Sequence, residues 1–280
     1  MNPERVAQCA VLAMLFELSS SPKPGNVDRC HDFSDIGFHH FLTSAVSAYP
    51  VFRKAANGRG SVGSLILEGV EAWQTWFLSS NTHFGSLVLM IPLAIAATKP
   101  GELHRELRRV LEKTTVIDAI DFYSAFEKAK ARVAEVDSFS LNDKNWQKTV
   151  QESGKTLLEL MRLSSEHDIV AREWSTNYER SFQLAERLVE QISRWGQNDG
   201  VVRTFLEALA EVPDSLICAK FGEETAQRVS RRAGEALLDD TLGKAHELDR
   251  SLLAEDINPG STADLIAASL FISLLRGLRF

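Results

Sequence analysis

The sequence predicts an all-α protein, organised as a single multi-helix globular domain over residues 1–280. Apolar residues recur at spacings of three and four along almost the whole chain, which is the period of a helix with one buried face. Strand signals are nearly absent, because no alternating apolar run is bounded by a hairpin turn such as Asn-Gly or Asp-Gly. Together these two observations favour a fold made of helices.

Three helices are predicted in the first third of the chain, the first of them after an Asn2-Pro3 start signal. Their apolar faces consist of Val6, Cys9, Ala10, Ala13 and Phe16; of Phe38, Phe41, Leu42 and Ala45; and of Leu65, Ile66, Gly69, Val70, Trp73, Trp76 and Phe77. The longest apolar run, from Leu87 to Ala97, contains Pro92 and is too short to span a bilayer. We therefore interpret it as a buried core helix.

Further helices are predicted at 102–112, 116–134, 151–164, 176–195, 199–211, 223–238, 243–254 and 262–278. Thr176 and Glu179 have the spacing of a capping box, in which two side chains satisfy the free amides of a helix start. Glycine and proline gather at 21–26, 58–63 and 258–260, which indicates short breaks between helices. The polar segment 135–150 is predicted to be a loop.

Charge and composition exclude several classes of protein. The net charge of −7 and pI of about 5.6 argue against a nucleic-acid binder, which usually has a basic face. Three cysteines give neither a disulfide framework nor a paired metal motif, so a reducing cytoplasm is expected. The N-terminal apolar stretch is interrupted by Gln8 and Glu17 and is not a signal peptide, and no membrane association is expected.

The first segment that could carry chemistry is 21–32, where prolines stiffen a polar loop. Lys23 and Arg29 can hold phosphate oxygens. Asp28 and Asp32 can bind Mg²⁺ or accept a proton, since Mg²⁺ is commonly held by one or two carboxylates plus substrate phosphates. The alternative is a rigid connector that carries only an ion pair.

The second segment is 81–86, just before the apolar helix. Asn81 or Thr82 could simply cap that helix. In the functional interpretation, the free amides of the helix start and the hydroxyls of Thr82 and Ser86 form an anion site. His83 would then add a proton donor or acceptor, although an isolated histidine is more often structural.

The third segment is 258–264, at the start of the last helix. Ser261 and Asp264 have capping-box spacing, so helix initiation alone could explain them. Alternatively, the amides from Gly260 to Thr262 cradle a phosphate while Asp264 holds a metal. The acidic pair Asp239-Asp240 is a weaker metal candidate, and a solvated surface pair is the simpler interpretation. No Walker A, HExxH or GxSxG motif is present, and no GxGxxG follows a predicted strand.

At these segments the sequence resembles the triphosphoribosyl-dephospho-CoA synthase family. Residues 21–29, SPKPGNVDR, resemble the family's TPKPGLVDR stretch, and residues 81–85, NTHFG, resemble NTHKG. Ser44-Ala45 and residues 258–265, NPGSTADL, complete the set in family order. One departure is Phe84, which stands where the family motif has lysine.

The resemblance implies an all-helical enzyme that acts on ATP and dephospho-CoA. Such an enzyme forms 2′-(5″-triphosphoribosyl)-3′-dephospho-CoA and releases adenine. Two alternatives remain open: a transferase or hydrolase of the same fold with another acceptor, and a non-catalytic helical interaction protein. Assembly into a homo-oligomer is also left open.

The resemblance also suggests roles for the candidate residues. Catalysis is assigned to His83 as acid or base, and to Asp28 and Asp264, which would hold Mg²⁺ or face the ribose. The residues expected to bind ATP are Lys23, Arg29, Asn81, Thr82, Gly260, Ser261 and Thr262. These roles require the three turns to converge on one metal-bound triphosphate.

Overall fold

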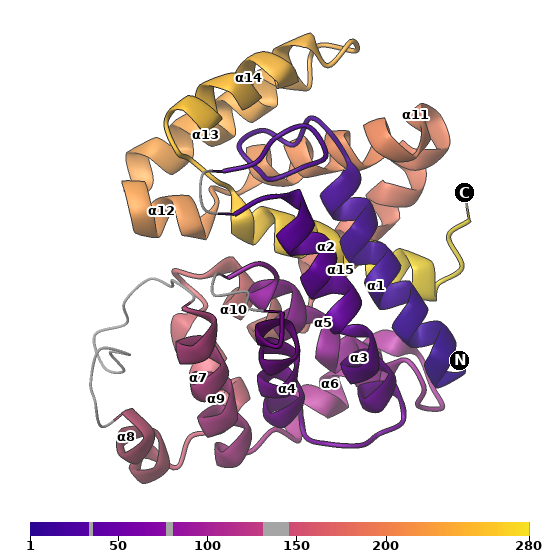
Figure 1. The fold of residues 1–280 in the computed structure, drawn as a ribbon, viewed down its shortest axis with the longest axis vertical. Coiled ribbons are helices and arrows are strands. Elements are labelled where there is room, and N and C mark those ends of the chain that lie inside the picture. The colour runs from indigo at the N-terminus through magenta and orange to yellow at the C-terminus, as the bar shows by residue number, and fades with distance from the viewer. Residues whose placement is uncertain (34–35, 77–80, 131–145, 280) are drawn as a thin grey trace. The chain divides into compact units, whose positions relative to one another are not determined.

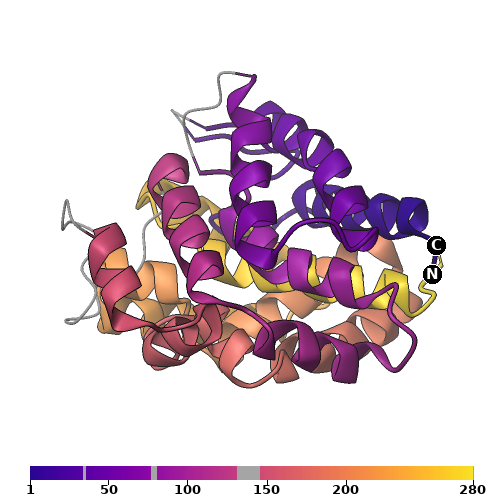
Figure 2. The same cartoon turned by 90° about the horizontal axis from the view of Figure 1, so that it is seen from below.

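The computed structural model describes residues 1–33, 36–76, 81–130 and 146–279. Figures 1 and 2 show the described chain as coiled ribbons joined by loops. All regular elements of this described part are α-helices, and its only β-type pairing is an isolated bridge between Asp28 and His31. The predicted all-α fold class is confirmed. No helix in these ranges is long and apolar enough to cross a membrane.

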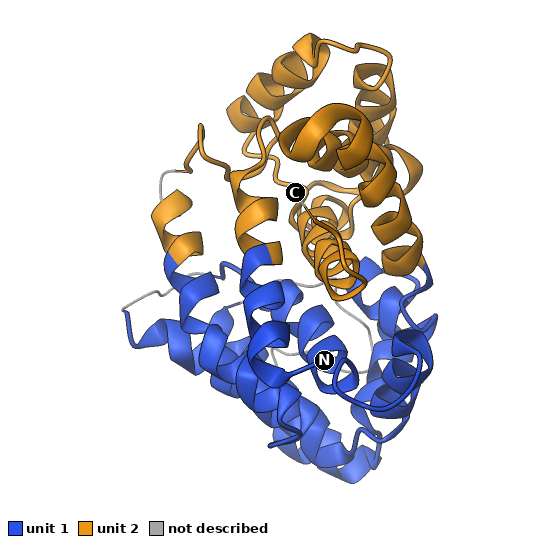
Figure 3. Ribbon diagram, turned by 90° about the vertical axis from the view of Figure 1, so that its right-hand side faces the viewer, with its two compact units in different colours: residues 1–12, 43–131, 135–179 blue, residues 13–42, 132–134, 180–280 orange. Residues whose placement is uncertain are grey.

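The chain divides into two compact units, which Figure 3 colours separately. Unit 1 comprises residues 1–12, 43–131 and 135–179, and unit 2 comprises residues 13–42, 132–134 and 180–280. Helices α1 (Pro3–Ser19) and α2 (Phe38–Ser47) contribute residues to both. The division does not test the expected single domain over 1–280, which stays a prediction.

Unit 1 contains α3 (Tyr49–Ala56), α4 (Val62–Gln74), α5 (Phe84–Ala96), α6 (Leu103–Glu112), α7 (Val116–Ala129), α8 (Trp146–Ser153), α9 (Leu157–Ser164) and α10 (Ile169–Ser175). Its largest fully buried side chains include Phe52, Leu65, Ile66, Trp73, Leu87, Trp174 and Tyr178. Helix α5 runs unbroken through Pro92, and nearly all of its residues are buried. The prediction of a core helix in this apolar run is confirmed.

Gly63 explains how closely α4 and α7 pack in unit 1. A Cβ at this position would lie 2.2 Å from the carbonyl oxygen of Asp118, so only glycine fits. The Gly63 amide also donates to Asp118 Oδ1 at 2.8 Å. The other oxygen of Asp118 accepts from Thr115, which closes the capping box of α7. The Asp118 carboxylate therefore caps the start of α7 and also holds the start of α4.

Unit 2 contains α11 (Glu179–Glu211), α12 (Ser215–Phe221), α13 (Glu223–Ala236), α14 (Gly243–Ala254) and α15 (Gly260–Leu275). Helix α15 is almost wholly buried, and its Ser273 hydroxyl donates to Ala185 O on α11 at 2.9 Å. Helix α11 is kinked at Gly196, whose φ of 80° and ψ of 172° are non-helical. The kink falls between the two helices that the sequence predicted at 176–195 and 199–211.

The capping box predicted at Thr176 and Glu179 is wrong. Thr176 ends α10 instead, and its hydroxyl donates back to Arg172 O at 2.9 Å. Asn177 and Tyr178 follow with φ values of 58° and 63°, and α11 begins at Glu179. Left-handed backbone at two consecutive non-glycine residues is rare, which is why the sequence did not indicate this reversal.

The single helix predicted at 151–164 is also wrong. Helix α8 ends at Ser153, Gly154 follows with a φ of 65°, and α9 begins at Leu157. Thr156 caps α9 through a capping box with Glu159. The predicted loop at 135–150 lies mainly outside the described residues, and its last residues belong to α8.

Candidate functional site

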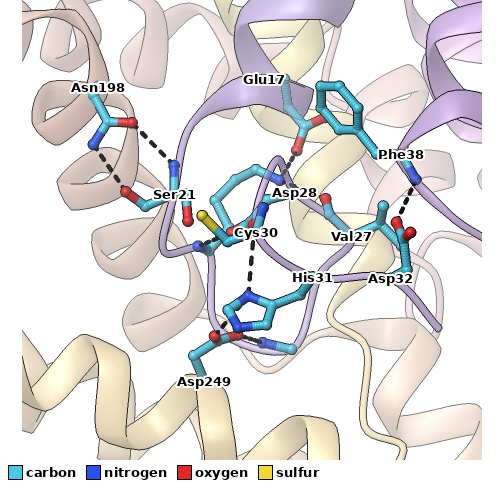
Figure 4. A network of polar contacts seen from close by, with 12 residues as sticks. Glu17, Ser21, Val27, Asp28, Cys30, His31, Asp32, Phe38, Asn198 and Asp249 are labelled. Atoms are coloured by element: carbon cyan, nitrogen blue, oxygen red, sulfur yellow. Dashed lines mark hydrogen bonds and ion pairs between the residues drawn. The ribbon is translucent and has the colours of Figure 1, made fainter.

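The first candidate loop, 21–32, lies in unit 2 and folds back on itself through a short backbone bridge (Figure 4). The Asp28 amide donates to His31 O at 3.2 Å, and the His31 amide donates to Asp28 O at 3.3 Å. Residues 21–28 are buried, whereas Arg29 and Cys30 at the tip are exposed. The loop thus has a fixed buried base and an accessible tip.

Lys23 lies in the buried base, and its side chain is 0% exposed. Its ammonium pairs with Glu17 Oε1 on α1 at 2.9 Å and donates to Val27 O at 3.2 Å. Burial raises the pKa of Glu17, and the Lys23 charge opposes that rise. These contacts give Lys23 the task of fixing the loop. Its predicted contact with phosphate stays a prediction, and the observed geometry counts against it.

Asp28 is also fully buried, and its carboxylate organises the turn. Oδ2 accepts from the Lys23 amide at 3.2 Å, and Oδ1 accepts from the Cys30 amide at 2.7 Å. Oδ1 also lies 3.5 Å from His31 Nδ1. Asp28 thus holds both ends of its own loop, as a short acidic side chain does in an Asx turn.

Two residues from helices of unit 2 hold the same loop from outside (Figure 4). Asn198 on α11 accepts from the Ser21 amide at 3.0 Å and donates to Ser21 O at 2.8 Å. Asp249 on α14 accepts from the Gly25 amide at 3.0 Å through Oδ1. Its Oδ2 lies 3.1 Å from His31 Nδ1. Burial raises the pKa of Asp249, while the Gly25 hydrogen bond and the His31 ring oppose that rise.

The sequence interpretation missed Glu17, Asn198 and Asp249. A signal was present for the two acids, because each lies on the apolar face of a predicted helix. Glu17 interrupts the first apolar run, and Asp249 directly follows the buried Leu248. A charged residue at a core position is rarely left unpaired, so each acid marks a buried partner. For Asn198 no comparable signal exists.

The first and third candidate turns meet within unit 2. Gly25 has a φ of 76°, and a Cβ there would lie 2.3 Å from Ile257 O. The Asn26 side chain donates to Pro259 O at 3.3 Å, directly before α15 begins at Gly260. Glycine is needed at position 25 both for its backbone angle and for this close approach. This contact meets one requirement of the predicted convergence of the turns.

The third turn is organised by Asp214, another residue that the sequence interpretation missed. Its Oδ2 accepts from the Thr262 amide at 2.7 Å and from the Thr262 hydroxyl at 2.8 Å. Its Oδ1 accepts from the amides of Leu216 and Ile217, which caps α12. Burial raises the pKa of Asp214, against the effect of these hydrogen bonds. The Thr262 amide, predicted to bind phosphate, is thus occupied by a carboxylate.

The capping box predicted for Ser261 and Asp264 is wrong. Helix α15 has Pro259 at its N-cap position, without a side-chain cap hydrogen bond. Ser261 Oγ instead accepts from Ser215 Oγ at 3.1 Å. Gly260, Ser261 and Asp264 remain partly exposed at the first turn of the helix, so their predicted roles toward ATP stay predictions.

The second candidate turn lies in unit 1, at the start of α5. His83 occupies the N-cap position of α5 without a side-chain cap hydrogen bond, and Asn81 Oδ1 accepts from the Phe84 amide at 3.1 Å. His83 is 2% exposed, and its Nδ1 shares a hydrogen bond of 2.5 Å with Ser44 Oγ. Thr82 is buried beside it. The contact of this turn with the other two, and the roles of Thr82 and His83, stay predictions.

Phe84, the departure from the family motif, is buried against aromatic residues of α7. Its ring centroid lies 5.6 Å from that of Phe122 and 5.7 Å from that of Phe126. Edge-on and tilted contacts at such distances are favourable between aromatic rings. The phenylalanine therefore has a packing role that anchors α5 on α7 in unit 1.

In the acidic pair Asp239-Asp240, Asp239 holds the start of α14, whereas Asp240 contacts Arg203. Asp239 accepts from the Thr241 hydroxyl and amide and from the Lys244 amide, and these hydrogen bonds lower its pKa to about 2. Among the described residues, no group of three or more His, Cys, Asp or Glu side chains is placed to hold a metal ion. The simpler interpretation of this pair therefore agrees with its contacts.

Asp239→Asn is expected to destabilise the protein modestly at neutral pH, and the difference should shrink as the pH falls from 5 to 3. The ionised carboxylate of the native state is favoured above the ordinary aspartate pKa of about 3.9. Its stabilisation is therefore lost as the pH falls through the lowered native value. Urea unfolding midpoints of the two proteins across this pH range test the prediction. A constant difference would contradict it.

The contacts of unit 2 define a helical protein in which the rigid polar loop 21–32 lies beside the start of α15. Comparison with known proteins identifies its family. The sequence pattern of the ATP:dephospho-CoA triphosphoribosyl transferase family matches residues 3–279. The chain belongs to this family. The resemblance seen in the motifs is confirmed, and the chain is an ATP-dependent triphosphoribosyl transferase by membership.

Individual relatives agree with this membership. A Pseudomonas fluorescens protein assigned as a 2-(5″-triphosphoribosyl)-3′-dephosphocoenzyme-A synthase is 23% identical, covering 96% of this chain and 91% of its own length. A Streptococcus equi subsp. zooepidemicus protein with the same assignment is 23% identical over 96% of both chains. A crystal structure of a candidate triphosphoribosyl-dephospho-CoA synthase from Archaeoglobus fulgidus is 30% identical, with a TM-score of 0.73, covering 86% of this chain and all of the other.

Proposed function

We propose that this protein transfers the 5-triphosphoribosyl group of ATP to dephospho-CoA and releases adenine. The observation that carries the proposal is the family match along residues 3–279, within which the motif-bearing turns lie. Relatives assigned to this synthase activity, matched over 96% of the chain, support the same reaction. ATP and dephospho-CoA are the substrates that the family description implies.

The reaction breaks the bond between ribose C1′ and adenine N9, and it forms a bond between C1′ and the acceptor hydroxyl oxygen. Positive charge develops on C1′ in the transition state, as it does in glycoside cleavage. A nearby carboxylate would stabilise that charge, and a base must accept the hydroxyl proton. Adenine leaves with the electrons of its bond and takes up one proton.

The residues proposed to contact ATP are those that remain accessible in the two turns of unit 2. Arg29 is exposed at the tip of the first loop and is suited to phosphate, since a guanidinium can bind two phosphate oxygens at once. Gly260 and Ser261 lie at the partly exposed start of α15, where amides favour an anion. Asp264 follows one turn later and is proposed to face the ribose or a metal ion.

Mg²⁺ is proposed to enter with the triphosphate and to be held chiefly by phosphate oxygens, as is usual for this ion. Asp28 does not fit as a ligand, because it is fully buried and its two oxygens accept from the amides of Lys23 and Cys30. We therefore propose no metal contact for Asp28.

The purified protein, given Mg-ATP and dephospho-CoA, is expected to release adenine and to form one product that carries the triphosphoribosyl group. Mass spectrometry of the products tests this, with CoA as the control acceptor, since its ribose phosphate distinguishes it from dephospho-CoA. The proposal would fail if dephospho-CoA were recovered unchanged while another acceptor, or water, took the ribosyl group.

A further inference from the structure

His31 contacts the buried acids Asp28 and Asp249 in unit 2, yet its own side chain is partly exposed. Its side chain is 31% exposed, whereas those of Asp28 and Asp249 are 0% and 1% exposed. Its Nδ1 is buried and faces both carboxylates, at 3.5 Å and 3.1 Å. The exposed part of the ring is therefore the other edge, which carries Nε2.

Two carboxylates beside Nδ1 favour the ring form that carries a hydrogen there. In that form Nε2 holds the free lone pair and can accept a proton from outside. The backbone of His31 is fixed at the same time, because its amide and carbonyl both bond to Asp28. Carboxylate contact at one imidazole nitrogen, with the other nitrogen left accessible, is the arrangement that orients a catalytic histidine.

The charged and titratable groups around the ring come from the loop and from α14. The loop contributes Asp28, while α14 contributes Asp249 and the exposed His246, whose charge affects Asp249. The Lys23 side chain is fully buried and pairs with Glu17. The charged side chains nearest to the ring are therefore the two carboxylates of Asp28 and Asp249.

We propose that His31 is the general base of the transfer reaction, with Asp28 and Asp249 as the positioning residues that hold its Nδ1 side. This inference rests on the proposed function. The acceptor O–H bond breaks, its proton moves to His31 Nε2, and the oxygen bonds to C1′ as the C1′–N9 bond breaks. His31 then releases the proton to solvent, and adenine takes one up, so the protons balance.

His31 suits this task better than His83, the histidine that the sequence interpretation selected. His83 is only 2% exposed, and its Nδ1 is bound to Ser44 within unit 1. A base must come within hydrogen-bond reach of the substrate proton. The half-buried ring of His31, next to the exposed tip of a rigid loop, can reach a substrate proton without a conformational change.

His31→Gln is expected to lower kcat for adenine release by about 10²- to 10⁴-fold, the usual contribution of a general base. The KM for ATP should change by less than about threefold, because a general base acts in the chemical step and contributes little to substrate binding. The wild-type rate should fall at acid pH because a protonated ring cannot accept a proton, and the variant should lose this limb. His167→Gln, an exposed histidine in unit 1, is the matched control and should keep the wild-type rate.

Two further measurements separate catalysis from folding. Added imidazole should restore part of the rate in His31→Ala, and Asp249→Asn, which keeps an oxygen for the Gly25 amide, should lower kcat more than it changes the KM for ATP. A His31→Gln variant that folds and releases adenine at the wild-type rate would overturn the role of His31 and leave the transferase function standing. Wild-type protein that makes no product from dephospho-CoA would overturn both.

Discussion

Lys23→Met is expected to lower the free energy of unfolding by about 3–5 kcal/mol, the usual effect of removing one partner of a buried ion pair. The ammonium of Lys23 is the charged partner of Glu17, and both side chains lie out of water. Methionine leaves the Glu17 carboxylate buried without a countercharge and removes the donor to Val27 O. Urea unfolding at pH 7 measures the difference.

The pH dependence of this loss identifies its cause. Burial raises the pKa of Glu17 above its ordinary value of about 4.3, and removing the lysine raises it further. The native variant then binds a proton that the unfolded chain binds only at lower pH. Its stability deficit should therefore be largest at pH 7 and shrink as the pH falls toward 5.

Lys54→Met is the matched control for Lys23→Met. Lys54 pairs with Glu68, but the two side chains are 42% and 41% exposed. Exposed pairs of this kind contribute about 0–1 kcal/mol. Equal losses in the two variants would contradict a structural role for the buried pair. The double variant Glu17→Gln with Lys23→Met should recover part of the loss, because neither member of the pair is left as a buried charge without its partner.

Asp214→Ala is expected to destabilise the protein by roughly 3–4 kcal/mol, because buried donors that lose their acceptor each cost about 1–3 kcal/mol. The carboxylate accepts four hydrogen bonds, two that cap α12 and two from Thr262 at the start of α15. The variant should also release adenine more slowly, since the accessible residues of the third turn lose their anchor. Thermal unfolding and initial rates measure the two effects.

Asp168→Ala separates the two tasks of Asp214. Asp168 caps α10 through the amides of Val170 and Ala171 in the same way. The loss of a helix cap alone costs about 1 kcal/mol. If Asp214→Ala were no more damaging than Asp168→Ala, the link between α12 and α15 would contribute nothing.

The fold class followed from the sequence because a buried helix face imposes its spacing on the chain. The boundaries from Gly243 to Ala254 were predicted to the residue, and the core helix with Pro92 was recognised from its apolar run. Errors arose where rare backbone angles end a helix. The reversal at Asn177 and Tyr178 is an example, because asparagine tolerates a positive φ but tyrosine rarely adopts one.

The candidate loops were recognised from their composition, but their partners were not. Gly25 and Asp249 are 224 residues apart in sequence, and Ser21 and Asn198 are 177 residues apart. No local pattern encodes such pairs, which form only when distant helices pack. This affected the functional assignment: Lys23 and Asp28 were predicted to be ligands for phosphate and metal, whereas Lys23 pairs with Glu17 on α1 and both residues hydrogen-bond within the loop.

The catalytic role of the 21–32 loop and the adjoining start of α15 is tested most directly by hydrogen exchange, with dephospho-CoA and Mg-ATP added separately. We expect slower exchange in peptides that cover residues 29–33 and 258–264, and no change in α13 (Glu223–Ala236), which serves as the internal reference. Unchanged exchange in both turns, with new protection appearing elsewhere in the chain, would contradict the placement of the site in these turns.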